Sequence, residues 1–331
     1  MKRLLSLLLV FVIVFAGCAS TDEAPADTNV KEKGAGEVAT EEQAEEPKTV
    51  TITHKFGTVT VPFNPTRVVV PDMGALDIMD VFGLEDNIVG VVKKNLPSYL
   101  SNKYKSDKYT ALGSLKELDL EAIYALEPDC IIISGRQSGY YDQLSEIAPV
   151  VFCEIDRERE YMDYFSDYLN TVAKIFGKEA ETQQYIDDFN ARLETINKKV
   201  TENGYTTLVT ILSSRTLKAL GANTRCSLIY NEAGFTNLGE GFTPAKHGDA
   251  TSFEYVVDIN PDFLFVVDKN SATGKTEYEP AVEQLENELV KTTKAYKNGN
   301  IVYLNPREWY LVECGLTSTE RMIADLEDAL K

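Results

Sequence analysis

Apolar residues between positions 158 and 176 recur with the spacing of one helix face. They follow one another at steps of three or four residues: Met162, Phe165, Leu169, Val172 and Phe176. Acidic and polar residues fill the other face, so the pattern predicts one long helix of about five turns at 3.6 residues per turn. Gly177 predicts its end, and the same spacing predicts a second helix up to residue 200. Periodicity alone leaves an ordinary surface helix as the alternative.

The segments on the two sides of this helix resemble each other. Each has a short helix, a Pro-Asp turn, an apolar strand and then a cation just past the strand. One offset of 133 residues relates residues 120–133 to residues 253–266 and places Arg136 on Lys269. This single repeat predicts two similar lobes, joined by one stiff helix, with a cleft between them.

Strand and helix patterns alternate along most of the remaining chain. Alternating apolar residues predict a hairpin over residues 50–61, with Gly57 in the turn. Asp119 and Ser252 are the expected N-caps of the two repeated helices. Further strands are expected at 67–70, 88–92, 130–133, 150–155, 207–212, 263–267 and 301–304, and helices at 72–82, 227–233 and 317–330. The alternation predicts an α/β fold with two Rossmann-like lobes and mostly parallel sheets.

About 280 residues follow the N-terminal segments, which is enough for two lobes of ordinary size. We expect an N-terminal lobe at 50–156, an interlobe helix at 157–176 and a C-terminal lobe at 177–331. The whole binding domain is expected to cover about 66–331.

The chain begins with the pattern of an exported protein. Residues 1–18 combine a basic start with an apolar run that is too short to span a membrane, since a span needs roughly 20 apolar residues. The run ends at Ala16-Gly17-Cys18, which resembles a lipobox in which Cys18 receives the lipid. The alternative is an ordinary secretory signal with a chance cysteine. Residues 19–48 are rich in Thr, Ala and Glu and predict a disordered tether.

The net charge of −19 argues against a nucleic acid as partner. An anionic ligand would need a local cationic site that acts against the field of the whole protein. Arg136 and Lys269 are expected at the carboxyl ends of strands, where open α/β sheets bind ligands. Arg225 lies in a loop before a helix, so three cations could face one cleft. For any one of them a surface ion pair is the alternative.

Several motifs of the chain together point to a known family. The general ones are the lipobox, Pro65-Thr66-Arg67-Val68-Val69, Leu120-Glu121-Ala122-Ile123, Pro128-Asp129, the single long central helix and Asn260-Pro261-Asp262. Together they resemble a lipid-anchored substrate-binding protein of an iron-siderophore ABC importer. Others resemble the petrobactin branch, which binds ferric catecholates: Ile132-Ile133-Ser134-Gly135-Arg136-Gln137, Asn223-Thr224-Arg225, His247-Gly248, Val266-Val267-Asp268-Lys269-Asn270 and Trp309-Tyr310-Leu311. The resemblance implies a monomeric extracytoplasmic protein, anchored by lipid, that binds its ligand without catalysis or an intrinsic cofactor.

The resemblance also implies roles for single residues. Arg136 and Arg225 match anion-contacting positions of the family. Lys269 stands where that branch usually has arginine, so the planar guanidinium group is replaced by a compact ammonium charge. His247 and Tyr310 match positions that can reach ferric iron when a siderophore leaves two coordination sites open. The alternatives are a loop histidine bonded to backbone and an aromatic pocket wall. Trp309 is expected to line the site or to pack beneath it.

Glu121 and Glu254 are related by the repeat and lie in the first turns of equivalent helices. The resemblance implies that they dock on the permease dimer, which works with a cytoplasmic ATPase. A favourable carboxylate at a helix N-terminus is the compatible alternative. A stiff interlobe helix predicts only a small closure of the lobes on loading.

Rival functions stay open on the same fold. Binding of heme or another iron chelate is one, although three cations argue against cobalamin. A receptor for free metal would need several His and carboxylate ligands, and the chain has two histidines. Cys130, Cys153, Cys226 and Cys314 show no CxxC spacing, and the first two fall in apolar strands. No nucleophile motif suggests an enzyme, and Ser213-Ser214 beside Arg215 is interpreted as a loop at a strand end.

Overall fold

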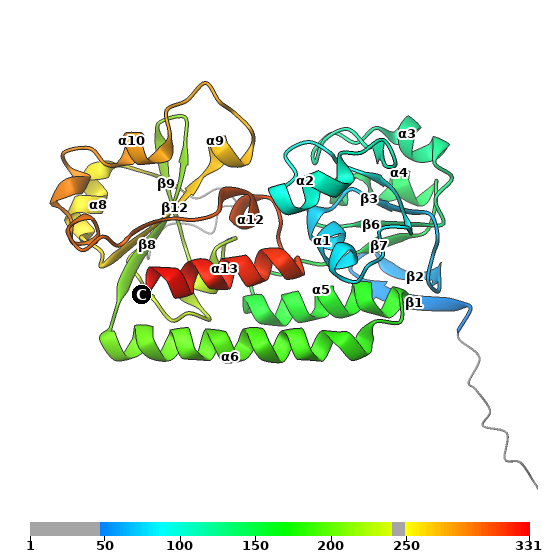
Figure 1. Ribbon diagram of the computed structural model, residues 1–331, viewed down its shortest axis with the longest axis horizontal. Helices are drawn as coiled ribbons and strands as arrows, with labels where there is room; N and C mark the ends of the chain where they lie inside the picture. The colour runs from blue at the N-terminus through cyan, green and yellow to red at the C-terminus, as the bar shows by residue number, and fades with distance from the viewer. Residues whose placement is uncertain (1–46, 240–248) are drawn as a thin grey trace, which may run out of the picture. The chain divides into compact units, whose positions relative to one another are not determined.

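Two α/β lobes are seen in the computed structural model, which describes residues 47–239 and 249–331 (Figure 1). The N-lobe contains a five-stranded sheet in the order β5-β4-β3-β6-β7, and all neighbouring strands are parallel. Its elements are β3 (Val68–Val70), α1 (Met73–Val81), β4 (Ile88–Val91), α2 (Ser98–Tyr104), β5 (Thr110–Ala111), α3 (Leu120–Ala125), β6 (Cys130–Ile133), η1 (Ser138–Tyr140), α4 (Tyr141–Ser145) and β7 (Val150–Phe152). The hairpin of β1 (Thr49–His54) and β2 (Gly57–Pro62) precedes them.

Three strands of the N-lobe sheet are apolar throughout because elements cover both of its faces. Every residue of β3, β6 and β7 is buried, which is the pattern that parallel strands require. Helix α1 packs on β3, and Met73–Met79 are all buried because other helices cover the opposite side of α1. Asp72 caps α1 by accepting hydrogen bonds from the backbone N–H groups of Gly74 and Ala75.

The C-lobe contains a mixed sheet of six strands. Strands β8, β12 and β13 are parallel, β10 pairs in parallel with β8, and β9 and β11 are antiparallel additions. The elements are β8 (Thr206–Ser213), β9 (Thr216–Leu220), α7 (Ser227–Tyr230), β10 (Thr236–Asn237), β11 (Asp249–Thr251), α8 (Phe253–Ile259), β12 (Phe263–Asp268), α9 (Lys269–Ala272), α10 (Ala281–Leu285), η2 (Val290–Thr292), α11 (Lys294–Lys297), β13 (Ile301–Tyr303), α12 (Pro306–Tyr310) and α13 (Leu316–Ala329). The predicted α/β class with mostly parallel sheets is confirmed.

The β8–β9 hairpin was not expected from the sequence. The loop expected at the strand end near Ser214 and Arg215 is the two-residue turn between its antiparallel strands. Both residues have positive φ, 50° and 67°, as a tight hairpin turn requires. The turn carries neither Gly nor Asn, so it gave no signal in the sequence.

Two long helices follow the N-lobe, and both were predicted as helices, the first of them as the connection between the lobes. Helix α5 (Tyr161–Ile175) packs against α1 and β1 on the N-lobe side and against α7 on the C-lobe side. Its C-terminus is followed by Gly177 at φ 64°, the left-handed conformation expected of a helix stop. Helix α6 (Glu179–Asn203) then runs beneath α5 and α13 (Figure 1).

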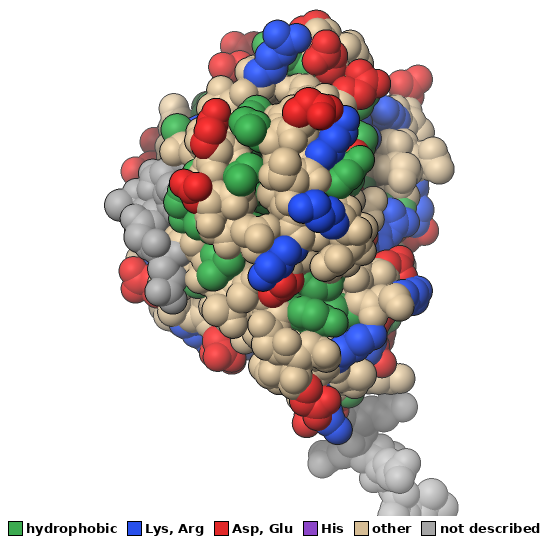
Figure 2. All heavy atoms as spheres, turned by 90° about the vertical axis from the view of Figure 1, so that its left-hand side faces the viewer, with side chains coloured by type: hydrophobic (Ala, Val, Ile, Leu, Met, Phe, Trp, Pro, Cys, Tyr) green, Lys and Arg blue, Asp and Glu red, His purple; other side chains and the backbone are tan. Residues whose placement is uncertain are grey.

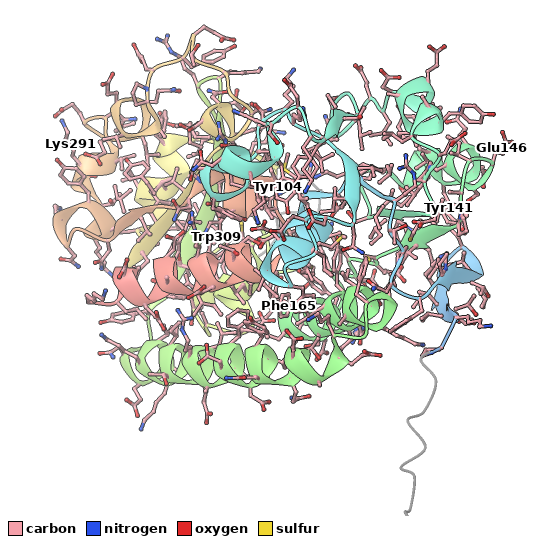
Figure 3. All side chains as sticks on the ribbon, turned by 45° about the vertical axis from the view of Figure 1, so that its right-hand side comes forward. Tyr104, Tyr141, Glu146, Phe165, Lys291 and Trp309 are labelled. Atoms are coloured by element: carbon pink, nitrogen blue, oxygen red, sulfur yellow. The ribbon has the colours of Figure 1, made fainter. Side chains whose placement is uncertain are left out.

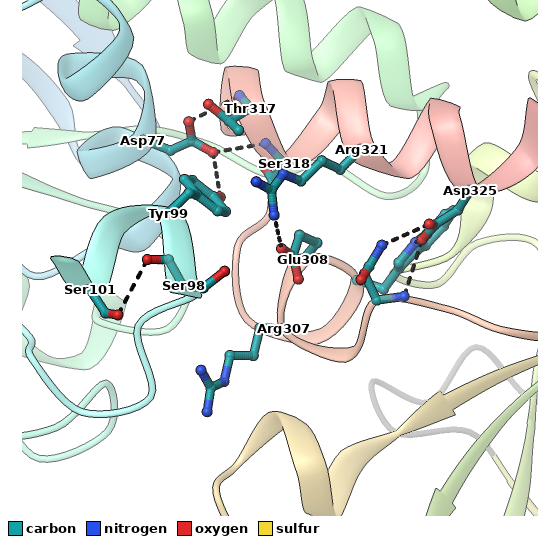
Figure 4. A network of polar contacts seen from close by, with 12 residues as sticks. Asp77, Ser98, Tyr99, Ser101, Arg307, Glu308, Thr317, Ser318, Arg321 and Asp325 are labelled. Carbon is teal, nitrogen blue, oxygen red and sulfur yellow. Dashed lines mark hydrogen bonds and ion pairs between the residues drawn. The ribbon is translucent and has the colours of Figure 1, made fainter. Parts of the chain in front are cut away.

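A second connection between the lobes was not predicted. Helix α13 of the C-lobe packs on α1 of the N-lobe, and Asp77 of α1 caps it (Figure 4). The Asp77 carboxylate accepts hydrogen bonds from the N–H groups of Thr317 and Ser318 at 3.0 and 2.9 Å, and from the Tyr99 hydroxyl at 2.8 Å. Burial raises the pKa of Asp77, while these hydrogen bonds act in the opposite direction. The contact between α13 of the C-lobe and α1 of the N-lobe therefore depends on one buried carboxylate, that of Asp77 in the N-lobe.

The repeat extends to side-chain contacts. Asp129 accepts hydrogen bonds from the N–H groups of Thr66 and Arg67 before β3, and Asp262 accepts from the N–H and hydroxyl of Thr206 at the start of β8. Asp119 and Ser252 also cap α3 and α8 as expected. Each lobe thus uses an aspartate at the equivalent position to hold an equivalent pair of strands together.

The described residues belong to one compact unit. The boundaries at 50–156, 157–176 and 177–331 stay predictions, as do the signal and the tether, since Cys18 and residues 19–46 lie outside the described ranges. Within those ranges, no helix is both long and apolar enough to span a membrane.

Candidate anion-binding site

Two of three basic side chains lie where the sheets expose the carboxyl ends of their parallel strands, and the third lies in a loop before a helix. Arg136 follows β6, Lys269 begins α9 directly after β12, and Arg225 precedes α7 in the loop after β9. Arg225 is only 5% exposed, and Arg136 and Lys269 are partly buried. Arg136 and Lys269 thus lie at strand ends, and Arg225 lies in the loop before a helix, where the sequence predicted them.

These three cations converge on Tyr310 at the end of α12. Arg136 and Arg225 both donate to the Tyr310 carbonyl oxygen, at 2.5 and 2.7 Å. The two guanidinium carbons lie 5.9 and 4.4 Å from the centre of the Tyr310 ring, and the Lys269 ammonium lies 5.8 Å from it. An aromatic face attracts cations at such distances, so Tyr310 holds three positive charges together.

The positive charges are only partly balanced. Burial lowers the pKa of Arg136, and the like charge of Arg225 lowers it further. Among the described residues, Nε of Arg225 is buried and has no hydrogen-bond partner. A site with crowded cations and an unused donor is suited to bind an anion.

Sequence reasoning missed two charged residues beside the cluster. Arg157 donates to both carboxylate oxygens of Glu313, at 2.7 and 2.5 Å, and both side chains are largely buried. Burial by itself would raise the pKa of Glu313, but the charges of Arg157, Arg225 and Arg136 outweigh it and hold the pKa below 4.5. Glu313 is therefore the internal counter-ion of three arginines. Arg157 follows the end of β7, which was a usable signal, whereas the loop that carries Glu313 offered none.

Two hollows flank the cluster. One of about 310 Å³ on the N-lobe side is lined by Lys55, Asp72, Lys116, Ser134, Gly135, Arg136, Ser138, Phe152, Glu154, Ile155, Arg157, Arg225, Leu311 and Glu313. The other, of about 270 Å³ on the C-lobe side, is lined by Ile211, Ser213, Ser214, Thr216, Lys218, Lys269 and Tyr310. Together they give the cluster access to solvent from both lobes.

A larger hollow of about 480 Å³ lies between the N-terminal hairpin and α5. Its cations are already occupied, because Arg159 pairs with Asp167 at 2.7 Å and Lys174 donates to the Thr51 carbonyl. We therefore place the candidate site at the smaller hollows, where the charge is unbalanced. On the C-lobe end in Figure 2, acidic and basic side chains are interspersed.

The structure separates the remaining candidate ligand residues. Trp309 is 2% exposed, lies beside α13 (Figure 3) and donates its indole N–H to Asp325 at 2.8 Å. It thus packs behind Tyr310 and lines neither hollow, which corresponds to the packing alternative. His247 lies outside the described residues. In the described ranges, no group of three or more His, Cys, Asp or Glu could hold a metal, and the four cysteines at 130, 153, 226 and 314 are buried and unpaired.

Glu121 and Glu254 both lie exposed in the first turns of α3 and α8. Neither makes an ion pair with another described residue. A hydrogen bond from its own backbone N–H lowers the pKa of Glu254, and one from Ser252 adds to the effect. Both carboxylates are thus accessible to a partner.

Comparison with known proteins defines the class. The chain belongs to the family described as periplasmic binding protein, whose profile matches residues 68–308. Among its relatives, the petrobactin-binding protein YclQ of Bacillus subtilis is 38% identical over 288 residues, which cover 85% of this chain and 88% of YclQ. The ferric-anguibactin-binding protein FatB of Vibrio anguillarum is 26% identical and covers 84% of this chain and 86% of its own.

Solved structures agree with this assignment. The crystal structure of YclQ superposes with a TM-score of 0.81 at 34% identity and covers 86% of this chain and 99% of its own. The periplasmic catecholate-siderophore binding protein VctP of Vibrio cholerae gives 0.79 at 39% identity, with coverages of 85% and 99%. The resemblance stated from the sequence is therefore confirmed.

Proposed function

We propose that this protein captures an anionic ferric siderophore of the catecholate type, similar to ferric petrobactin, and delivers it to the permease of an ABC importer. The convergence of Arg136, Arg225 and Lys269 on Tyr310 carries the proposal. A ferric complex of three catecholates carries three negative charges. Charge-assisted hydrogen bonds from guanidinium groups to its oxygens are stronger than neutral ones.

The likeness to petrobactin- and catecholate-binding relatives supports this choice of ligand. Tyr310 and His247 are proposed to reach the iron when the siderophore leaves coordination sites open. The protein acts by binding rather than catalysis, and the ferric complex is its cargo. Heme, whose propionates are also anionic, is the alternative ligand that the test below includes.

The first test is a titration of the protein without residues 1–48, followed by the fluorescence of Trp309, the single tryptophan. Ferric catecholates are compared with a neutral ferric hydroxamate, heme and Zn²⁺. A lost hydrogen bond to a charged group costs about 1.5–3 kcal/mol, so Arg136→Ala and Arg225→Ala should each weaken catecholate binding by about 10- to 150-fold. Arg159→Ala, which removes a cation outside the site, is the matched control.

Three outcomes would decide the ligand. Tight binding of catecholates alone, lost in both site variants, supports the cationic site. Tight binding of the neutral hydroxamate would mean that the cations do not select the ligand. Binding of heme or Zn²⁺ alone would overturn the proposed function.

We further propose that Glu121 and Glu254 dock on the permease, and that lipid at Cys18 holds the monomeric protein at the outer face of the cell membrane. The exposure of both carboxylates at repeat-related positions supports docking. Glu121→Arg and Glu254→Arg should abolish uptake of the iron complex by whole cells while binding in solution stays unchanged. Unchanged uptake by the double variant would contradict the docking role.

Loading is proposed to close the lobes only slightly. Helices α5 and α13 both pack on α1, so two separate connections oppose a large rotation. Small-angle scattering of the free and loaded protein should therefore give nearly the same radius of gyration, and a large compaction would refute this part.

A further inference from the structure

The tip of the N-terminal hairpin forms part of the wall of the N-lobe hollow. Lys55 and Phe56 connect β1 to β2, and Lys55 lines the hollow together with Arg136 and Arg225. Phe56 fixes the tip, since its ring stacks on Tyr141 at 4.1 Å between centres and 13° between planes. Tyr141 lies at the outer side of the N-lobe (Figure 3).

Two aromatic rings position the Lys55 ammonium. It lies 4.3 Å from the centre of the Phe152 ring and 5.1 Å from that of Phe56, which themselves meet edge to face at 5.1 Å. Phe152 is 2% exposed and ends β7, so the support is rigid. A ring face attracts the charge but accepts no conventional hydrogen bond, so the ammonium N–H groups stay available. Within the described residues, no carboxylate or carbonyl group pairs with Lys55.

The hollow has a surplus of positive charge. Five basic side chains line it, Lys55, Lys116, Arg136, Arg157 and Arg225, against three acidic ones, Asp72, Glu154 and Glu313. Two of these carboxylates are already bonded inside the protein. Asp72 accepts from two backbone N–H groups and from Tyr168, and Glu313 pairs with Arg157. The hollow therefore has a net charge of about +2, which favours the binding of an anionic ligand.

Lys55 lies before the segment that the family profile matches, which begins at residue 68. We propose that Lys55 is a specificity-determining residue, which donates hydrogen bonds to an anionic oxygen, carboxylate or catecholate, of the complex that Arg136 and Arg225 hold. This inference rests on the proposed function and assigns one ligand contact to the hairpin.

The test compares Lys55→Gln and Lys55→Glu with Lys291→Glu, a charge reversal at the far end of the C-lobe (Figure 3). Affinities for a ferric tris-catecholate and for a neutral ferric hydroxamate are measured by the fluorescence of Trp309 at two salt concentrations. We expect Lys55→Gln to weaken catecholate binding by about 3- to 10-fold and Lys55→Glu by about 10- to 100-fold. Lys291→Glu should change it less than 2-fold, and hydroxamate binding should be unaffected by any of the three.

Two results would overturn the inference. One is that Lys55→Glu binds the catecholate as tightly as the wild type while Arg136→Ala binds it weakly. This result would refute the role of Lys55 and would leave the proposed function intact. The other is that Lys55→Glu and Lys291→Glu weaken binding equally, since only the overall field would then matter. If Arg136→Ala and Arg225→Ala also bind like the wild type, the proposed function itself fails. Because Lys55 is exposed, its variants should keep the melting temperature of the wild type.

Discussion

Replacement of Glu313 by Gln is the most informative perturbation of the site. It keeps the shape of the side chain and removes the negative charge that Arg157, Arg136 and Arg225 share. Loss of one partner from a buried ion pair costs about 3–5 kcal/mol. The side chains of Arg157 and Glu313 keep 24% and 14% exposure, so Arg157 can regain some water. We therefore expect the lower end, about 3 kcal/mol at pH 7, or roughly 6–12 °C in melting temperature.

The pH dependence of this loss provides a stricter test. The folded-state pKa of Glu313 lies below its ordinary value of 4.5, so its contribution to stability is present above pH 4.5 and is lost as the pH falls through the lowered pKa. The difference between wild type and Glu313→Gln should therefore be full at pH 7 and should shrink below about pH 4.5.

Thermal unfolding, followed by circular dichroism at pH 7, 5, 4 and 3, measures both effects. Glu181→Gln is the matched control, because the exposed Lys178–Glu181 pair on α6 should contribute less than about 1 kcal/mol. A Glu313→Gln protein within about 1 kcal/mol of wild type at pH 7 would refute the role of Glu313 as counter-ion. So would a difference that stays constant down to pH 3.

Three further predictions concern the scaffold. Asp77→Ala leaves three donors without their acceptor and should lower the free energy of unfolding by about 3 kcal/mol or more. Asp119→Ala removes one exposed cap bond and should lower it by about 1 kcal/mol. Urea unfolding compares the two variants, and equal losses of stability would contradict the interlobe role of Asp77. Gly74→Ala places a methyl group 2.1 Å from a backbone oxygen and should lower the melting temperature by several degrees, whereas Gly139→Ala meets nothing within 4 Å and should not. Burial raises the pKa of Glu232 to about 7, so the free energy of unfolding of the wild type should decline as the pH rises from 4.5 to about 7. In denaturant titrations, Glu232→Gln should therefore be more stable relative to wild type at pH 8 than at pH 5. The same difference in stability at both pH values would count against the raised pKa.

The sequence predicted most elements because burial in an α/β fold leaves a periodic record. Val68–Val70 and Cys130–Ile133 are continuous apolar runs since both faces of the sheet are covered. Helices α5 and α6 showed a clear stripe because each has one buried face. Strand β9 was missed, since it is short, contains Lys218 and follows a turn of Ser214 and Arg215 that lacks the usual turn residues.

The site was predicted only as far as it depends on local rules. Arg136 and Lys269 could be found because they follow predicted strands, and Arg225 because it lies in the loop before a predicted helix. The loop between α12 and α13 brings Glu313 against Arg157, a residue 156 positions earlier, through tertiary packing that leaves no periodic signal. The convergence of Arg136 and Arg225 on the Tyr310 carbonyl, with Lys269 near the Tyr310 ring, is likewise a property of the folded loop.

Asp129 and Asp262 hold equivalent strands together in the two lobes by the same bond. The shared contact matches the repeat in the sequence, and the β8–β9 hairpin belongs to the second lobe. Glu121 and Glu254 occupy matching places in the two lobes. If both carboxylates dock as proposed, a receiving surface that presents the same patch twice, as a pair of identical subunits does, would match them.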